Sequence, residues 1–424
     1  MKPTRLLSGT FLLLLVAAPL WAQGLPTASP EEVGLSSERL ERIAPFLQRH
    51  IDEDLIAGSV VMVARNGRVA YHEAFGGLDM DADTPMAKDS IFRIYSMTKP
   101  ITSLAVMMLW EEGLFLLNDP VSKYIPELGG LRVGTDGVGA DGQPEFSTMR
   151  SSRDMTVRDL LRHTSGLTYG IFGSSTVDKM YNEEELLDSE SLAEFVDQLS
   201  QLPLRYDPGT TWNYSVSTDV LGRFVEVVSG MPFDQFLEER IFRPLEMNDT
   251  AFWVPESKAH RLTTLYTPNG PGDLTLKEME TDGIARDYRE PPAAPSGGGG
   301  LLSTATDYVR FCQMLLNGGE LGGIRLLGTH TVEMMTRDHL GDIEMGLGSA
   351  GHGFGLGFMI NTDLGLVGGT AHEGTYSWGG YAHTRFWVDP VDDLIGIFMI
   401  QILPSSAVDY GEKFKSLVYQ SILN

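Results

Sequence analysis

The chain has 424 residues, of which 42% are hydrophobic and 21% charged, as expected of a globular protein with a large core. A formal net charge of -25, with no basic cluster, excludes a nucleic-acid-binding protein. The nine histidines show no metal-ligand spacing, and neither Cys-x-x-Cys nor a phosphate-binding glycine loop is present. We therefore expect neither a metal nor a cofactor.

The first residues predict a secretory signal peptide over residues 1–22. A basic start up to Arg5 is followed by an apolar run from Phe11 to Ala18 and a cleavage point after Ala22. The alternative is an uncleaved membrane anchor. Since no later apolar stretch reaches membrane length, we expect an exported protein, periplasmic or extracellular, without a membrane span. Cys312 is the only cysteine, so the chain folds without disulfides.

Local patterns then predict the first elements in chain order. Helical spacing of apolar residues covers 30–51. Two β-rich runs, 58–65 and 68–75, are joined by Asn66-Gly67, which is a strong hairpin signal. The run from Thr98 to Trp110 is so apolar that it predicts a buried helix.

The middle of the chain, from about 115 to 285, is expected to be mostly helical, with a long Gly- and Asp-rich loop over 129–145. The runs 382–388 and 394–400 predict adjacent strands, and 410–423 predicts a final helix. These elements indicate an α+β fold. An antiparallel sheet is built from both ends of the chain, flanked by helices, and carries an inserted, mostly helical lobe.

This fold divides residues 23–424, which form one domain, into two lobes. We expect an α/β lobe at about 30–115 plus 290–424, and a helical lobe at about 116–289. No Gly-x-Ser-x-Gly turn is present, which argues against an α/β-hydrolase.

The segment Ser96-Met97-Thr98-Lys99 carries the main chemical signal. At the start of a helix, residues three apart share a face, so the hydroxyl and the amine can meet. A helix N-terminus also favours a developing oxyanion, and an uncharged amine there is able to take the serine proton. The tetrad alone is weak, since a capping serine beside a surface lysine gives the same pattern.

Tyr214 precedes a helical run that begins near Asp219. A tyrosine at such a junction can point its hydroxyl into a cleft, although a core aromatic residue with a satisfied hydroxyl is the simpler interpretation.

With these residues in place, the chain resembles the serine β-lactamase and penicillin-binding-protein superfamily, in its class C-like branch. The resemblance runs from about residue 30 to the end. Besides Ser96-x-x-Lys99, it is carried by residues 156–167 (TVRDLLRHTSGL), 206–209 (YDPG) with Tyr214-Ser215, 244–250 (PLEMNDT), 300–307 (GLLSTATD), and Trp378-Gly379-Gly380 before 386–390 (FWVDP).

The resemblance implies a β-lactamase/transpeptidase-like fold and a role for each matching residue. Ser96 would be the nucleophile that forms the acyl-enzyme, and Lys99 and Tyr214 would share the proton transfer. Which of these two is the resting base stays open. The oxyanion hole would consist of the Ser96 N–H and a strand N–H near Trp378, Gly379 and Gly380, namely that of Tyr381.

Two departures from the class C pattern bear on the substrate. Val216 stands where class C β-lactamases carry the asparagine of Tyr-x-Asn, and no lysine lies between Lys277 and Lys413 to supply the Lys-Thr-Gly cation. Trp378-Gly379-Gly380 in its place is similar to the family VIII carboxylesterases and suits neutral groups. Two alternatives stay open: His372-Glu373-Gly374 as the third motif, and Trp378 as a packing residue on an edge strand.

The favoured hypothesis is a serine hydrolase acting as a carboxylesterase on small or medium acyl esters. The alternatives are a class C-like β-lactamase or D-alanyl peptidase acting on β-lactams or peptidoglycan-type peptides, and a non-catalytic penicillin-binding sensor. In the same resemblance, His163 is a buried, hydrogen-bonded side chain at a structural corner and not a catalytic base. The oligomeric state and the natural substrate are not predicted.

Overall fold

The computed structural model describes residues 24–80, 84–270, 273–279, 287–347 and 349–423. The signal peptide predicted for residues 1–22 lies outside the described residues. Within the described ranges, no helix is both long and apolar enough to cross a membrane.

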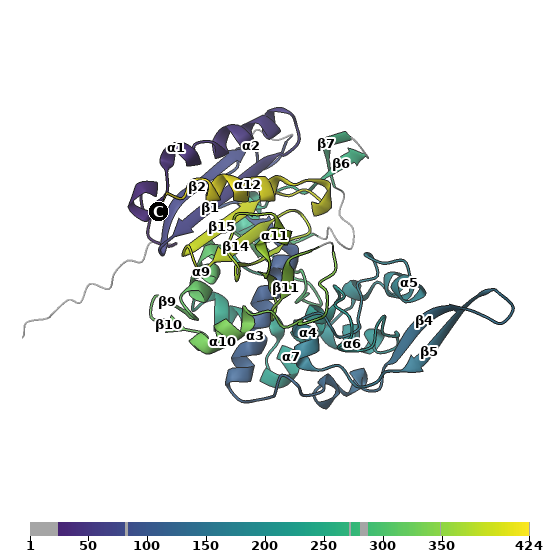
Figure 1. Cartoon of the computed structure of the whole chain (residues 1–424). Coiled ribbons are helices and arrows are strands. Elements are labelled where there is room, and N and C mark those ends of the chain that lie inside the picture. Colours follow the sequence, from purple (N-terminus) through teal and green to yellow (C-terminus); the bar gives the residue numbers. More distant parts are fainter. Residues whose placement is uncertain (1–23, 81–83, 271–272, 280–286, 348, 424) are drawn as a thin grey trace, which may run out of the picture.

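A seven-stranded antiparallel sheet forms the centre of the molecule (Figure 1). Its strands follow the order β11-β12-β13-β14-β15-β1-β2. They are β1 (Gly58–Arg65), β2 (Arg68–Gly76), β11 (His352–Phe354), β12 (Met359–Asn361), β13 (Tyr376–Gly379), β14 (Arg385–Asp389) and β15 (Leu394–Met399). Because β1 pairs with β15, the two ends of the chain share one sheet. The predicted α+β architecture is confirmed.

The β1–β2 hairpin shows why this sheet is covered on both faces. Asn66 and Gly67 have φ values of 53° and 71°, which the two-residue turn between right-twisted strands requires. Along β1, Val60 and Met62 enter one core, while Val61 and Val63 enter the other. Every residue of β1 is buried, so each face needs its own layer of helices.

The first layer contains α1 (Ser37–Leu40), α2 (Ile43–Asp52) and α12 (Tyr410–Tyr419), and the second is formed by α3 (Thr98–Glu111) and α9 (Ala305–Leu316) (Figure 1). The helix predicted over 30–51 is thus divided into a 3-10 turn at Pro30–Val33, α1 and α2. The break follows Gly34, whose φ of 72° ends the first turn.

In the helical lobe, helix α7 (Ser217–Ser229) packs against α3. Its other helices are α4 (Val157–Leu161), α5 (Thr176–Glu183), α6 (Leu192–Leu199) and α8 (Phe233–Leu237). Two further helices, α10 (Thr329–Met335) and α11 (Leu364–Val367), and two short strand pairs belong to the α/β lobe. The strand pairs are β3 (Phe92–Arg93) with β8 (Leu302–Ser303), and β9 (Glu320–Leu321) with β10 (Ile324–Arg325).

The prediction of a long loop over 129–145 is wrong. Strands β4 (Arg132–Val138) and β5 (Pro144–Arg150) pair along their whole length and project from the helical lobe (Figure 1). Most of their side chains are exposed, so this ribbon is held by backbone pairing and lacks the apolar alternation that marks a half-buried strand. A second hairpin, β6 (Tyr266–Gly270) with β7 (Asp273–Glu278), also lies in the region expected to be helical.

Candidate active site

Ser96 lies in a 3-10 turn, Tyr95–Met97, that leads directly into α3. The apolar sequence of α3 explains its position, because nearly every residue from Thr98 to Leu109 is buried between the sheet and the helical lobe. Tyr95 has a φ of 42°, a conformation that non-glycine residues seldom adopt and that clusters at functional sites. The turn therefore fixes Ser96 at the buried end of a rigid helix.

Three side chains predicted from the sequence meet at the oxygen of Ser96. The Lys99 amine donates to Ser96 Oγ at 3.1 Å, one helical turn away. The Tyr214 hydroxyl donates to the same oxygen at 2.6 Å from the loop before α7. Lys99 Nζ also lies 4.6 Å from the centre of the Tyr214 ring. The serine oxygen is thus placed between two groups able to exchange its proton.

Lys99 is almost completely buried, and its Nζ atom lies within hydrogen-bond distance of three oxygen atoms. Besides Ser96 Oγ, it donates to the carbonyl oxygen of Gly298 at 2.6 Å and to the Tyr169 hydroxyl at 2.9 Å. Three neutral oxygens therefore hold the Lys99 side chain in one position. Among the described residues, no carboxylate lies within ion-pair distance of Lys99, so neutral oxygens provide most of its solvation.

Asp219 is connected to Lys99 through the hydroxyl of Tyr169. The Tyr169 hydroxyl donates to Asp219 Oδ2 at 3.5 Å. The other oxygen of Asp219 accepts the Ser296 hydroxyl at 2.5 Å and the Gly298 N–H at 3.0 Å. Burial raises the pKa of the Asp219 carboxyl, although Lys99 and these donors act in the opposite direction. Burial likewise holds the pKa of Tyr169 well above its usual value.

Sequence reasoning did not find Tyr169, Asp219 or Gly298 as site residues. One signal was available in the glycine run 297–300. A Cβ on Gly298 would lie 2.4 Å from the Asp219 carboxylate and 2.7 Å from the Tyr169 hydroxyl, so this position must be glycine for the three groups to meet. Tyr169 and Asp219 themselves carry no local pattern, because they reach the site through long-range packing.

Trp378 lies at the end of β13, beside Tyr214. Its indole N–H donates to the Tyr214 hydroxyl at 3.4 Å, and the two ring centres are 5.4 Å apart. Its ring also packs on Phe354, in an apolar cluster with Trp212. Strand β13 lies between β12 and β14, so the expected edge position is wrong, whereas the packing contacts of the alternative interpretation are present. Trp378 thus forms an aromatic cluster with Tyr214 and Phe354.

Gly380 and Tyr381 follow the same strand and approach Ser96. A Cβ on Gly380 would lie 2.5 Å from the carbonyl oxygen of Ile94, two residues before Ser96, so the glycine permits this close backbone approach. The Gly380 N–H is used, since it donates to Thr384 at 2.7 Å. The ring of Tyr381 lies 6.4 Å from that of Tyr95. The Tyr381 N–H as an oxyanion donor stays a prediction.

His372, the other candidate for the third motif, lies at the opposite end of β13. Its Nδ1 atom is 3.0 Å from Asp389 and 3.5 Å from Asp392. Asp389 also accepts the Tyr419 hydroxyl at 2.7 Å. Gly379 at the other end pairs with Arg385, so strand length separates His372 from the residues around Ser96.

His163 is buried at a corner between α4 and Ser165, in a left-handed conformation with a φ of 56°. Its Nδ1 shares a hydrogen bond with Ser215 at 3.3 Å, and its ring lies 4.9 Å from that of Tyr214. Burial and the nearby charge of Lys99 hold the pKa of His163 well below its usual value. An uncharged, packed imidazole agrees with the expected structural role.

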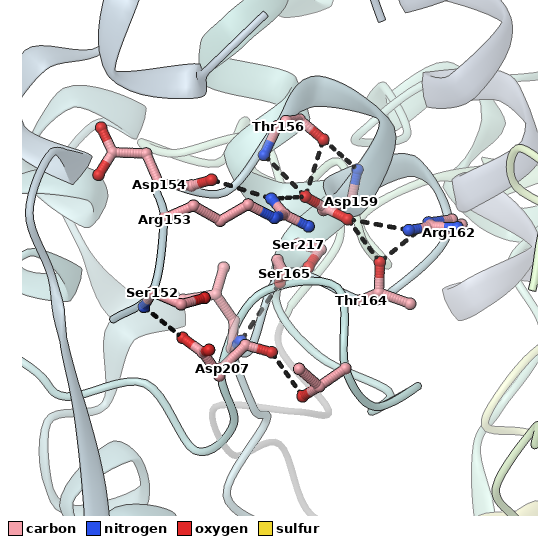
Figure 2. A network of polar contacts seen from close by, with 12 residues as sticks. Ser152, Arg153, Asp154, Thr156, Asp159, Arg162, Thr164, Ser165, Asp207 and Ser217 are labelled. Atoms are coloured by element: carbon pink, nitrogen blue, oxygen red, sulfur yellow. Dashed lines mark hydrogen bonds and ion pairs between the residues drawn. The ribbon is translucent and has the colours of Figure 1, made fainter. Parts of the chain in front are cut away.

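A network around Asp159 fixes this corner (Figure 2). Asp159 accepts Arg153 at 2.6 Å and the hydroxyls of Thr156 and Thr164, both at 2.8 Å. Arg162 approaches its second oxygen at 3.2 Å. The network ties the start of α4 to the segment that carries His163, and the carbonyl oxygen of His163 accepts the N–H of Asn213, the residue before Tyr214, at 2.8 Å.

This geometry is that of a serine hydrolase with a β-lactamase/penicillin-binding-protein fold, and comparison with known proteins agrees. The family model described as Beta-lactamase matches residues 43–418. The chain belongs to this family.

The relatives and solved structures extend over nearly the whole chain. It is 36% identical over 367 residues to Protein Rv1367c of Mycobacterium tuberculosis, covering 84% of this chain and 89% of that protein. It is 30% identical over 396 residues to Esterase EstB of Burkholderia gladioli, covering 88% and 92%. Among solved structures, EstCE1, described as a hydrolase with promiscuous acyltransferase activity, matches with a TM-score of 0.71 and 27% identity over 91% of this chain and 99% of that chain.

Proposed function

We propose that this protein is an exported carboxylesterase that cleaves small or medium acyl esters through an acyl-enzyme at Ser96. The observation that carries the proposal is the position of Ser96 Oγ, 3.1 Å from the Lys99 amine and 2.6 Å from the Tyr214 hydroxyl. The likeness to a protein named Esterase EstB supports the ester as substrate.

The proposed reaction has two halves. Ser96 Oγ attacks the ester carbonyl carbon while its proton passes to the Lys99–Tyr214 pair, and the C–O bond to the alcohol breaks as the alcohol takes up that proton. Water then attacks the acyl-enzyme, gives its proton to the same pair, and releases the acid when Ser96 takes the proton back. The N–H groups of Ser96 and Tyr381 would stabilise the oxyanion in each half.

The walls of the cleft favour an ester over a substrate with a fixed anionic group at the scissile bond. Trp378 occupies the strand position where a lysine would hold a carboxylate, and its ring packs with those of Tyr214 and Phe354. Val216, at the other departure from the class C pattern, is buried and offers no amide to a substrate. An apolar wall binds neutral acyl or alcohol groups.

The test is hydrolysis of 4-nitrophenyl butyrate by the wild type and by Ser96→Ala. We expect a burst of 4-nitrophenol equal to the enzyme concentration in the wild type and no burst in the variant, with a loss of at least 10³-fold in kcat. Ser416→Ala, which removes a hydroxyl on the remote helix α12, is the matched control. Activity retained by Ser96→Ala would overturn the proposal, and faster turnover of a chromogenic cephalosporin would favour a β-lactamase.

Export rests on the pattern of residues 1–22 and has its own test. Expression of the full chain in a secreting bacterial host should yield a mature protein that begins at Gln23, as measured by intact mass. A mass that includes residues 1–22 would favour the anchor.

A further inference from the structure

A cavity of about 160 Å³ lies in the helical lobe next to the aromatic cleft. Its walls include Phe172, Asp178, Arg205, Tyr206 and Asn213. Most of the lining is polar, in contrast to the wall formed by Trp378 and Tyr214, and the volume is large enough for a small polar group with its bound water.

Phe172 joins this cavity to the cleft. Its half-exposed ring lies 5.8 Å from the Tyr214 ring, 6.0 Å from that of Tyr169 and 6.4 Å from that of Tyr381. One face of Phe172 therefore meets the residues around Ser96, and the same side chain lines the polar cavity. Phe172 is therefore the side chain that lies between the cavity and the residues around Ser96.

Arg205 is the only cation among the described residues that line the cavity. Its Nε lies 3.8 Å from Asp178 Oδ2, and its guanidinium carbon lies 4.7 Å over the ring of Tyr206. Both contacts orient the guanidinium plane. Among the described residues, the ion pair of Arg205 involves Nε alone, and its two terminal amino groups have no hydrogen-bond partner, so the forked end that suits a carboxylate is available.

Asp178 does not compete strongly for that fork, because its oxygens are already bonded. One accepts the Thr168 hydroxyl at 2.7 Å, and the other accepts the Ser175 hydroxyl at 2.6 Å and the Ser175 N–H at 3.0 Å. Asp178 is therefore a positioning residue for Arg205. In a chain with a net charge of -25, an anionic group needs such a local cation to bind.

We infer that this cavity is a subsite for a carboxylate carried by the ester substrate, held by the forked end of Arg205. The inference rests on the proposed function and narrows it to esters with an acidic group on the acyl or the alcohol side. Trp378 then meets the neutral part of the substrate, and the charged end extends past Phe172 into the helical lobe.

The experiment compares kcat/KM for matched acidic and neutral esters in the wild type and in Arg205→Gln. The acyl-side pair is 4-nitrophenyl hydrogen glutarate and 4-nitrophenyl pentanoate. The alcohol-side pair is 4-(butanoyloxy)benzoate and 4-(butanoyloxy)benzamide. We expect the acidic-to-neutral ratio to fall at least tenfold in Arg205→Gln for one pair, which identifies the side, and to be partly kept in Arg205→Lys.

Arg150→Gln, on the exposed strand β5, is the control for the loss of one surface charge and should leave both ratios unchanged. Unchanged ratios for both pairs in Arg205→Gln, or an equal fall in Arg150→Gln, would overturn the inference.

A binding measurement separates this inference from the proposed function. Calorimetry measures the Kd of 4-nitrophenyl hydrogen glutarate for the non-hydrolysing Ser96→Ala protein. We expect this Kd to be at least tenfold higher in the double variant Ser96→Ala/Arg205→Gln. If binding depends on Arg205 but the wild type cleaves no ester, only the proposed function fails. If neutral esters are cleaved and binding is independent of Arg205, only the subsite fails.

Discussion

Asp159 and Asp219 occupy the same position in two helices but have opposite environments. Each is a buried carboxylate at the third residue of its helix, α4 or α7. Although burial alone would raise the pKa of Asp159, the bonds from Arg153 and Thr156 lower it to about 2. Asp219 has no arginine among its contacts in the described part of the chain, and burial raises its pKa.

The difference separates a structural carboxylate from one that belongs to the cleft. Asp159 receives enough hydrogen-bond donors to stay charged at neutral pH. Its partners are the arginines and threonines of the same corner (Figure 2). The bonds of Asp219 lead through Tyr169 to Lys99 and from there to Ser96. Burial of an under-compensated acid costs folding free energy, and active sites are where proteins commonly accept such a cost.

The largest effect on activity is expected for Tyr214→Phe, near the Asp219 network. The change removes the hydroxyl that donates to Ser96 Oγ at 2.6 Å and keeps the ring packing. We expect kcat for 4-nitrophenyl butyrate to fall about 10²–10⁴-fold with an unchanged Tm, because one partner of the proton transfer is lost. Steady-state kinetics and a thermal melt measure the two quantities.

Tyr181→Phe is the matched control for that change. Its hydroxyl is buried in the helical lobe and has no hydrogen-bond partner in the structure, so its removal should leave kcat as it is. A Tyr214→Phe protein within threefold of the wild type would remove Tyr214 from the proton transfer.

Asp159→Asn tests the structural role of the Asp159 network. The substitution removes a charge that is bonded to Arg153 and leaves the mostly buried Arg162 without its partner. We expect the free energy of unfolding at pH 7 to fall by about 3 kcal/mol, measured by urea denaturation. The kcat of the folded variant should change much less than in Tyr214→Phe.

The pH dependence of this loss follows from the sign of the shift. The pKa of Asp159 is about 2 when folded, below its usual value of 3.8, so its stabilising contribution is complete above about pH 4. It is lost as the pH falls from about 4 to 2, and the wild type and Asp159→Asn should converge in that range. A constant difference down to pH 2 would contradict the assigned ion pairs.

Asp219→Asn should behave in the opposite way. Because the pKa of Asp219 is raised in the fold, the protonated form is favoured, and that contribution is lost as the pH rises through the folded pKa. An asparagine is uncharged at every pH and avoids the cost of burying a charge. The Tm of the variant at pH 7 should therefore be equal to or higher than that of the wild type. We expect kcat/KM to fall about 10–100-fold with a displaced pH profile, because an amide replaces the carboxyl group that accepts the Tyr169 hydroxyl. A lower Tm with an unchanged pH profile would assign Asp219 a structural role.

The same contrast explains what the sequence predicts well. The Asn66-Gly67 hairpin, the buried helix α3 and the spacing of Ser96 and Lys99 depend on residues close in the chain. The β4–β5 ribbon is not predicted from the sequence. It buries too little apolar surface to show the alternation of apolar and polar residues that marks a strand.

The remaining site residues depend on long-range packing. Tyr169 meets Lys99 across 70 residues of chain, and nothing in the sequence around either residue encodes that contact. The family resemblance, and not residue spacing, predicts the roles of Tyr214 and Trp378. Asp159 and Asp219 show the limit most clearly: the same residue at the same helical position differs only through partners that the fold supplies.

The smallest effect is expected at Trp378, where Trp378→Phe keeps an aromatic wall but removes the indole N–H. That group donates to the Tyr214 hydroxyl at 3.4 Å, a long bond of small net value, so kcat/KM for neutral esters should fall about two- to fivefold. Trp387→Phe on β14 is the control, because its indole N–H is buried without a partner and its ring packs on Phe414 in the other core. That control should cost stability and not activity. A Trp378→Phe loss as large as that of Tyr214→Phe would show that the indole N–H, and not the Lys99 side of the cleft, sets the position of the Tyr214 hydroxyl.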